Sequence, residues 1–230
     1  MDDSKPTELM FDIDAAGMCP GQGDVQACSG KKRGRPRAFC TDAVLDTTLE
    51  LFWMKGFTAT SLDDIAAATG VSRPSLFAAF GGKEAMYIKA MERYQEGLRQ
   101  QLDGVLTCNG EGDSMRAIID RYFDIMIAAY TGESDHPLGC AFMCTALNEA
   151  PQHESILEML QATIHGFDRR FQSFFEGARY FGCLRPDQDP KILTQIISGL
   201  TSNLLMRARA GSGRKELTDI ARATTAFLFP

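Results

Sequence analysis

Apolar residues recur three and four positions apart along most of the chain, which is the spacing of one face of an α-helix. The first predicted helix starts near Thr41 or Asp42, either of which can cap it, and it ends at Gly56. Two short helices follow, and a glycine pair separates them from a long helix that runs from Lys83 to about Leu106. The first part of the chain is therefore predicted to hold three helices followed by a long fourth one.

The remainder of the chain is also predicted to be helical. A linker over residues 107–113, with the sequence C-N-G-E-G in its middle, comes before a series of segments with helical spacing. These segments lie near residues 114–130, 137–149, 153–181, 190–209 and 214–228. Because no alternating pattern typical of a β-strand competes with them, the predicted fold class is all-α.

Residues 61–80 predict two short helices with a tight turn between them. Ser61 can cap the first helix, and Asp64 follows three residues later, as in a capping box. Gly70 supplies the turn, where a positive φ would be costly for other residues. Ser72 can cap the second helix. Such a helix-turn-helix presents its second helix to the major groove of DNA.

The apolar positions of this motif separate an inner side from an outer side. Its small core is predicted to consist of Ile65, Ala66, Val71, Leu76 and Phe80. The outer side of the second helix then carries Arg73, Ser75, Ala78 and Ala79.

The formal net charge is −6, and it is unevenly distributed. Residues 1–30 hold one lysine and six acidic residues, which gives −5. Residues 31–100 hold eleven lysines and arginines against eight acidic residues, which gives +3, and residues 101–230 hold twelve against sixteen, which gives −4. The positive charge coincides with the predicted helix-turn-helix, and near DNA the local field matters more than the total charge.

Composition indicates the cellular setting. The hydrophobic fraction of 44% suffices for a core, and no apolar run approaches the roughly 18–20 residues of a membrane span, so no membrane partner is expected. Residues 1–30 are poor in aromatic residues and rich in small polar ones, which predicts a disordered tail. The seven cysteines have no regular spacing, so we expect reduced thiols in the cytoplasm and no disulfide scaffold.

A set of positions over about residues 38–90 carries particular residue types in a fixed order and spacing. They are Thr41, Val44, Leu45, Leu51, Phe52, Gly56, Phe57, Thr60, Ser61, Asp64, Ile65, Ala66, Gly70, Val71, Ser72, Leu76, Phe77, Phe80, Lys83 and Glu84. This arrangement resembles the DNA-binding domain of TetR/AcrR-family transcriptional regulators. The resemblance implies a helix-turn-helix domain over residues 41–90, joined by the long helix to a helical effector-binding and dimerisation domain over residues 91–230.

The resemblance also implies which residues meet double-stranded DNA. Together with a basic arm, the predicted contacts are Arg33, Arg35, Arg37, Thr41, Ser61, Ser72, Arg73, Ser75, Phe77 and Lys83. Arg73 can reach a guanine edge or a phosphate, and Lys83 at a helix start suits a phosphate. Where family members commonly carry Tyr-x-His-Phe, this chain has Phe-Ala-Ala-Phe from Phe77 onward. The tyrosine hydroxyl and the histidine, which are habitual phosphate contacts, are therefore absent.

The basic arm occupies residues 31–40, ahead of the first helix. Its sequence R-G-R-P-R at residues 33–37 has the form of an AT-hook core, an extended segment that lies in a narrow, A·T-rich minor groove. The arm can therefore read sequence beside the major-groove site. Alternatively, it is a solvated cationic arm that adds only the affinity of counterion release.

The region after residue 91 carries two further implications of the resemblance. The first is a homodimer packed through the helices near 190–209 and 214–228, which would place two recognition helices one DNA turn apart on a near-palindromic operator. The second is a pocket for a small-molecule effector in each protomer. The candidate lining residues are Met126, Tyr130, Phe142, Met143, Phe167 and Phe171. Such a stripe at helical spacing is more often part of a plain core.

Cys140 and Cys144 lie four residues apart on a predicted helix and thus on one face. With His136 nearby, they could coordinate a soft metal ion. A thiol near a helix N-terminus, with a lowered pKa, could instead sense oxidants or electrophiles. Buried packing is the third interpretation of the same residues.

Other classes of function have weaker support. An enzyme of the Cys/His type is disfavoured by the presence of three histidines only and by the lack of a nucleophile elbow or a Gly-rich phosphate loop, so no catalytic residue and no cofactor are expected. An architectural DNA-binding protein would not need so large a helical domain. The predicted function is a sequence-specific transcriptional regulator, most simply a repressor that an effector releases from its operator. A thiol- or metal-responsive regulator is the alternative.

Overall fold

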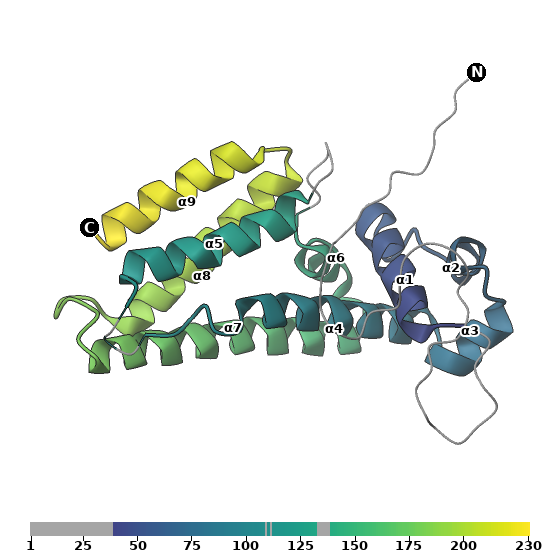
Figure 1. The fold of residues 1–230 in the computed structure, drawn as a ribbon. Helices are drawn as coiled ribbons and strands as arrows, with labels where there is room; N and C mark the ends of the chain where they lie inside the picture. The colour runs from purple at the N-terminus through teal and green to yellow at the C-terminus, as the bar shows by residue number, and fades with distance from the viewer. Residues whose placement is uncertain (1–38, 109, 111, 133–138) are drawn as a thin grey trace.

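The computed structural model describes residues 39–108, 110, 112–132 and 139–230, and the predicted tail and basic arm lie outside these ranges, apart from the last two residues of the arm. The described residues form nine α-helices and no strand (Figure 1). The helices are α1 (Thr41–Lys55), α2 (Leu62–Thr69), α3 (Arg73–Phe80), α4 (Lys83–Leu102), α5 (Met115–Thr131), α6 (Ala141–Glu149), α7 (Glu154–Tyr180), α8 (Pro190–Arg209) and α9 (Arg214–Leu228). The all-α prediction is confirmed, and the predicted bounds of the last three helices agree with the structure within one residue.

The helices are arranged along one long direction (Figure 1). Helices α1, α2 and α3 form one end of the molecule, and α5, α8 and α9 pack together towards the other end. Helices α4 and α7 run between the two ends, with α6 packed against α1, α4 and α7. None of the helices in the described ranges combines the length and the apolar character that a bilayer crossing needs.

Local signals define the helix-turn-helix formed by α2 and α3. The Ser61 hydroxyl accepts a hydrogen bond from the Asp64 amide, and the Asp64 carboxylate accepts one from the Ser61 amide, so the predicted capping box is present. Gly70 follows α2 with a φ of 67°, a left-handed conformation that glycine adopts without steric cost. Pro74 lies in the first turn of α3, where the missing N–H has no helical partner to lose.

Two predicted side-chain caps are wrong. Helix α1 begins at Thr41 itself, and its N-cap is Cys40, so neither Thr41 nor Asp42 caps it. Ser72 occupies the N-cap position of α3, but its hydroxyl makes no capping hydrogen bond. Its oxygen lies 2.9 Å from the hydroxyl oxygen of Ser75, so the two serines satisfy each other at the exposed start of α3.

The core of the helix-turn-helix is close to the predicted one. Its buried members are Ile65, Val71, Leu76 and Phe80, while Ala66 is half-buried. Ala79 departs from the prediction, because it is half-buried and packs against the core instead of lying on the outer side of α3. The reason is its place three residues after Leu76, which puts both side chains towards the same side of a helix.

Helix α4 ends at Leu102, so the predicted end at Leu106 is wrong. Asp103 is extended, with ψ of 129°, and Gly104 has a φ of 81°. The chain therefore leaves the helical conformation at Asp103, although the apolar residues after Gly104 continue the helical spacing.

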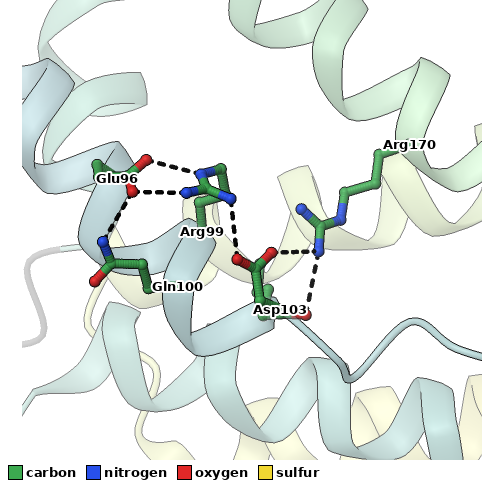
Figure 2. A network of polar contacts seen from close by, with 6 residues as sticks. Glu96, Arg99, Gln100, Asp103 and Arg170 are labelled. Atoms are coloured by element: carbon green, nitrogen blue, oxygen red, sulfur yellow. Dashed lines mark hydrogen bonds and ion pairs between the residues drawn. The ribbon is translucent and has the colours of Figure 1, made fainter. Parts of the chain in front are cut away.

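A polar network holds the last turn of α4 (Figure 2). The Asp103 carboxylate lies between two guanidinium groups, accepting hydrogen bonds from Arg99 at 2.9 Å and from Arg170 of α7 at 3.2 Å. Arg170 also donates to the carbonyl oxygen of Leu102 at 3.2 Å. An arginine of α7 thus satisfies a carbonyl at the end of α4 and fixes that end against α7.

Helix α6 begins at Ala141, later than predicted, and residues 133–138 lie outside the described part of the chain. Gly139 comes before it with a φ of 70°. A Cβ atom at this position would lie 3.0 Å from the sulfur of Cys144 and 3.2 Å from the carbonyl oxygen of Leu205. Both the conformation and the close approach therefore require glycine.

Cys108 and Cys183 form a disulfide that spans 75 residues of sequence. The structure therefore differs at this pair from the expectation that the thiols are reduced. Cys108 lies between α4 and α5, and Cys183 lies in the turn after α7. Their proximity arises from the packing of these helices, and the spacing of cysteines along the chain carries no sign of it.

An aromatic cluster joins the helix-turn-helix end to α4 and α6. The rings of Phe52, Phe57 and Tyr87 pack with centroids 5.2 to 5.8 Å apart. The hydroxyl of Tyr87 lies 2.6 Å from the hydroxyl of Thr145 on α6. Since Phe52 belongs to α1 and Tyr87 to α4, any movement of α4 is transmitted to α1 through close-packed rings.

Phe52→Ala should lower the free energy of unfolding by about 3–5 kcal/mol, because the ring is fully buried and contacts both other rings of the cluster. Met54 is the matched control, since it lies on the same helix and is 66% exposed. Met54→Ala should change stability by less than about 0.5 kcal/mol. Urea denaturation of both variants measures the difference, and an equal effect in the two would contradict the assignment of the core.

Candidate nucleic-acid interface

The outer side of α3 is the candidate surface for DNA. Arg73, Ser75, Phe77 and Ala78 are all exposed there. The ring of Phe77 is 63% exposed, which is unusual for a side chain of this size and leaves an apolar contact available on a two-turn helix. This side combines a guanidinium group, hydroxyl groups and an apolar surface, the group types that read base edges and thymine methyl groups in the major groove.

Arg73 forms an ion pair with Asp63 within the helix-turn-helix. Its Nη1 lies 3.2 Å from both carboxylate oxygens of Asp63 on α2. Both side chains are largely exposed, at 58% and 72%, so the pair contributes little to stability. The guanidinium can therefore exchange Asp63 for a phosphate or a guanine edge at small cost.

Two lysines of α4 lie close to the helix-turn-helix. Lys83, the first residue of α4, donates to the carbonyl oxygen of Phe57 at 3.0 Å, and its ammonium lies 4.2 Å from the centre of that ring. Lys89 donates to the carbonyl oxygen of Phe80, the last residue of α3, at 3.0 Å. Both lysines are thus engaged within the fold, and Lys89 is a positive charge at the end of α3 that the sequence prediction did not include.

The remaining predicted DNA contacts are placed as follows. Thr41 is half-buried at the start of α1. Ser61 and Ser72 are exposed at the starts of α2 and α3, where Ser61 is part of the capping box and Ser72 lies against Ser75. Arg33, Arg35 and Arg37 lie outside the described residues.

The helix-turn-helix end is also tied to the rest of the molecule by charged groups. Arg93 of α4 donates to both carboxylate oxygens of Asp46 on α1, at 2.6 and 3.1 Å. Glu84 of α4 accepts hydrogen bonds from Ser155 and His153 near the start of α7, and these bonds hold the pKa of Glu84 below its usual value. These charged groups therefore tie α1 to α4, and the start of α4 to the start of α7.

The six predicted effector-pocket residues lie within the helical body behind this surface. Met126, Tyr130, Phe142 and Phe171 are buried, and Met143 and Phe167 are half-buried. Burial raises the pKa of Tyr130 well above its usual value, so its hydroxyl stays neutral. Packed rings surround these positions, among them Phe167 and Phe171, whose centroids are 4.7 Å apart.

Two open hollows lie elsewhere, at the end of the molecule away from α3. The first has a volume of about 700 Å³ and is lined by the segment between α4 and α5 together with Ile118, Arg121, Arg170 and Phe174. The second has a volume of about 600 Å³ and lies between that segment and the C-terminal residues. Cys108 lines both hollows.

The environment of Cys140 and Cys144 favours packing. Cys140 is buried, and burial raises its pKa, so the predicted lowering by the helix N-terminus is wrong. The pKa of Cys144 is raised for the same reason. Among the described residues no group of three or more His, Cys, Asp or Glu side chains is arranged to hold a metal ion, and His136 lies outside them.

Comparisons with known proteins agree with this geometry. Residues 44–90 match the model of the bacterial regulatory proteins of the tetR family. The chain is 30% identical to the HTH-type transcriptional repressor ComR of Escherichia coli (strain K12) over 207 residues, which cover 90% of this chain and 97% of ComR. It is 26% identical to the uncharacterized HTH-type transcriptional regulator YezE of Bacillus subtilis (strain 168), over 83% of this chain and 90% of YezE.

A solved structure gives the same assignment. A cysteine-substituted form of CifR, a TetR family transcriptional regulator, complexed with 26-base-pair operator DNA, is 27% identical to the chain with a TM-score of 0.72. The match covers 86% of this chain and 100% of CifR. The likeness therefore extends beyond the helix-turn-helix to the helical body. The match to the family model, the likeness to ComR over 90% of the chain and the likeness to CifR together show that the chain belongs to the TetR family of bacterial transcriptional regulators.

Proposed function

We propose that the chain is a dimeric repressor that binds a near-palindromic operator through α3 and is released from it by a small-molecule effector. The observation that carries this proposal is the exposed outer face of α3 in a chain similar to a repressor over 90% of its length. Residues 41–90 act as the DNA-binding domain and residues 91–230 as the effector-binding and dimerisation domain. The protein works beside the chromosome in the cytoplasm and has no catalytic role.

Helix α3 enters the major groove with Arg73 as its main polar contact. Arg73 leaves Asp63 and binds a guanine edge or a phosphate, while Ser75 donates to an adjacent acceptor. Phe77 and Ala78 lie against thymine methyl groups or sugar carbons, which fits a helix that lacks the hydroxyl and imidazole groups common in the family. Phosphate contacts then fall to Lys83, Lys89 and the arm at residues 31–37.

Dimerisation uses an apolar face formed by α8 and α9, which pack against each other within the protomer. Ile192, Ile196 and Met206 of α8 are 59%, 37% and 60% exposed, and Phe227 of α9 is 84% exposed. On α8, Gly199 and Asn203 lie between these residues. The series 192, 196, 199, 203 and 206 then has alternating intervals of four and three residues, which is the spacing by which helices of two protomers pack together. Large apolar side chains gathered on one exposed face mark a protein–protein contact.

The effector acts through the helical body between these two surfaces. The pocket candidates Met126, Tyr130, Phe142, Met143, Phe167 and Phe171 lie on α5, α6 and α7. Helix α6 contacts α1 and α4, and Thr58 of the α1–α2 connection donates to Glu149 of α6 at 2.9 Å. An effector that binds one arrangement of these helices better than the other therefore changes the spacing of the two α3 helices.

Arg73→Ala should weaken binding to DNA selected from a random-sequence pool by about 1–3 kcal/mol per half-site, because the variant has no guanidinium to bind a base or a phosphate. Asp63→Asn should not weaken binding, since it removes the carboxylate that competes for Arg73. Arg185→Ala, in the exposed turn between α7 and α8, is the control for removal of one positive charge. Fluorescence anisotropy measures all three, and unchanged affinity of Arg73→Ala would contradict the docking of α3.

Log affinity for DNA falls linearly with log salt concentration. Deleting residues 31–37 should make this decrease less steep, by about 0.9 in slope for each phosphate that the arm neutralises. If the arm reads the minor groove, the deletion should also reduce the preference for A·T pairs that flank the selected site. Titrations at several salt concentrations, on DNA with A·T and with G·C flanks, measure both effects. Equal weakening on every flank would leave counterion release as the only role of the arm.

Phe227→Glu should convert the dimer to a monomer, because truncating or charging a central interface aromatic commonly costs at least about 2 kcal/mol. Leu147→Glu is the control, since Leu147 is 54% exposed on α6, outside the α8–α9 face. Light scattering after gel filtration gives the mass of each variant. A Phe227→Glu protein that remains dimeric would place the interface elsewhere.

A further inference from the structure

The disulfide between Cys108 and Cys183 has no role in the proposed repressor mechanism. Both cysteines are half-exposed, and Cys108 lines both hollows, so small solutes can reach the sulfur atoms. By contrast, Cys140 is buried among packed helices. The pair is therefore more accessible than Cys140. Cys144 is as exposed as the two paired cysteines by burial class, but it lines neither hollow.

A disulfide is unusual in the reducing compartment where a DNA-binding protein works. A repressor has to share a compartment with the chromosome, and that compartment keeps thiols reduced through glutathione and thioredoxin systems. Disulfides that form there in proteins of ordinary organisms are mostly transient and serve catalysis or redox sensing. A cysteine pair placed at bonding distance in such a protein thus points to a reversible modification.

The bond is attached to the far end of α4, the helix that reaches the DNA-binding end. Cys108 lies six residues beyond Leu102, the last residue of α4, and Arg170 of α7 already holds that helix end through Leu102 and Asp103 (Figure 2). Cys183 lies in the turn after α7, three residues beyond Tyr180. The disulfide is therefore a second, covalent tie between the segment that leaves α4 and the turn that follows α7.

The other end of α4 contacts the helix-turn-helix directly. Lys89 of α4 bonds the last carbonyl of α3, and Arg93 pairs with Asp46 of α1. Because α4 is a continuous helix of 20 residues, about 30 Å long, a shift at its exit is transmitted to its start. The state of the cysteine pair can therefore bias the placement of α3.

We propose that Cys108 and Cys183 form a redox site whose oxidation by hydroperoxides releases the protein from its operator. The inference rests on the proposed function as a DNA-binding repressor. The dithiol form, which a reducing compartment maintains, has no covalent link between Cys108 and Cys183, keeps the Arg170 contacts at the exit of α4, and binds DNA. The disulfide form fixes that exit covalently and holds the two α3 helices at a spacing that fits the operator less well.

The chemistry is a two-step oxidation of the pair. One thiolate attacks a hydroperoxide ROOH, so that an S–O bond forms as the O–O bond breaks, and protonation of the leaving oxygen gives an alcohol. The second thiolate attacks the resulting sulfenic acid, forms the S–S bond and displaces hydroxide, which leaves as water after protonation. In sum, two thiols and one hydroperoxide give a disulfide, an alcohol and water. A dithiol reductant reverses the reaction by exchange and becomes a disulfide itself.

The test begins with DNA selected from a random-sequence pool by the reduced full-length protein. If no sequence is enriched, the proposed DNA-binding function is contradicted, and the redox inference falls with it. If a sequence is enriched, its affinity is measured for reduced protein and for protein treated with hydrogen peroxide. Peptide mass mapping under non-reducing conditions follows the link between Cys108 and Cys183 in the same samples.

The linked protein should bind the selected DNA at least about tenfold more weakly, a typical size for coupling between two sites, and dithiothreitol should restore the affinity. Equal affinity of the two forms, or tighter binding by the linked form, would overturn the proposal while leaving DNA binding intact. Failure of peroxide to produce the link would overturn it as well. This comparison uses the unmodified chain and so does not depend on the folding of any variant.

Variants then assign the response to the pair. Cys108→Ser combined with Cys183→Ser should bind DNA as tightly as the reduced protein, with and without peroxide. Cys144→Ser, which removes a half-buried thiol outside the pair, should respond to peroxide like the unmodified chain. A peroxide response that persists in the double variant would contradict the assignment. Thermal unfolding monitored by circular dichroism confirms that each variant is folded before its affinity is compared.

Discussion

The fixing of α4 at both ends is the constraint on which the rest of the structure depends. At its start, Tyr87 packs against Phe52 and Phe57, which joins the helix to α1. At its end, Arg170 binds the Leu102 carbonyl and the Asp103 carboxylate. The first contact is a close-packed apolar one that resists gradual deformation, whereas the second is polar and partly exposed. Rearrangement is therefore cheaper at the exit of α4 than at its start.

Helix α3 shows how a two-turn helix can be kept in place and still leave a face available. A helix this short is not stable alone, so its position comes from tertiary packing. Leu76 and Phe80 supply that packing from one side, and Ala79 adds a small contact. The opposite side holds Arg73 and Phe77, which make no contribution to the core and are therefore available for a ligand.

Features set by neighbouring residues could be predicted from the sequence, and features set by tertiary packing could not. The bounds of α8 and α9 follow from local spacing between breaks, as does the capping box at Ser61. The end of α4 was missed because Val105 and Leu106 continue the helical spacing while packing as an irregular segment. The ion pair of Arg73 and the disulfide of Cys108 join residues whose proximity depends on how helices cross.

The geometry of a long helix explains why a modest change far from DNA can matter. With a length of about 30 Å, a tilt of about 10° at α4 displaces its far end by about 5 Å. The two recognition helices of a dimer have to match half-sites about 34 Å apart, and the proposed α8–α9 interface keeps the protomers together while the tilt occurs. A displacement of that size in each protomer is a large fraction of a groove width. In the proposed mechanism, a small event at the exit of α4 therefore separates a form that fits the operator from one that does not, without any change in the residues of α3.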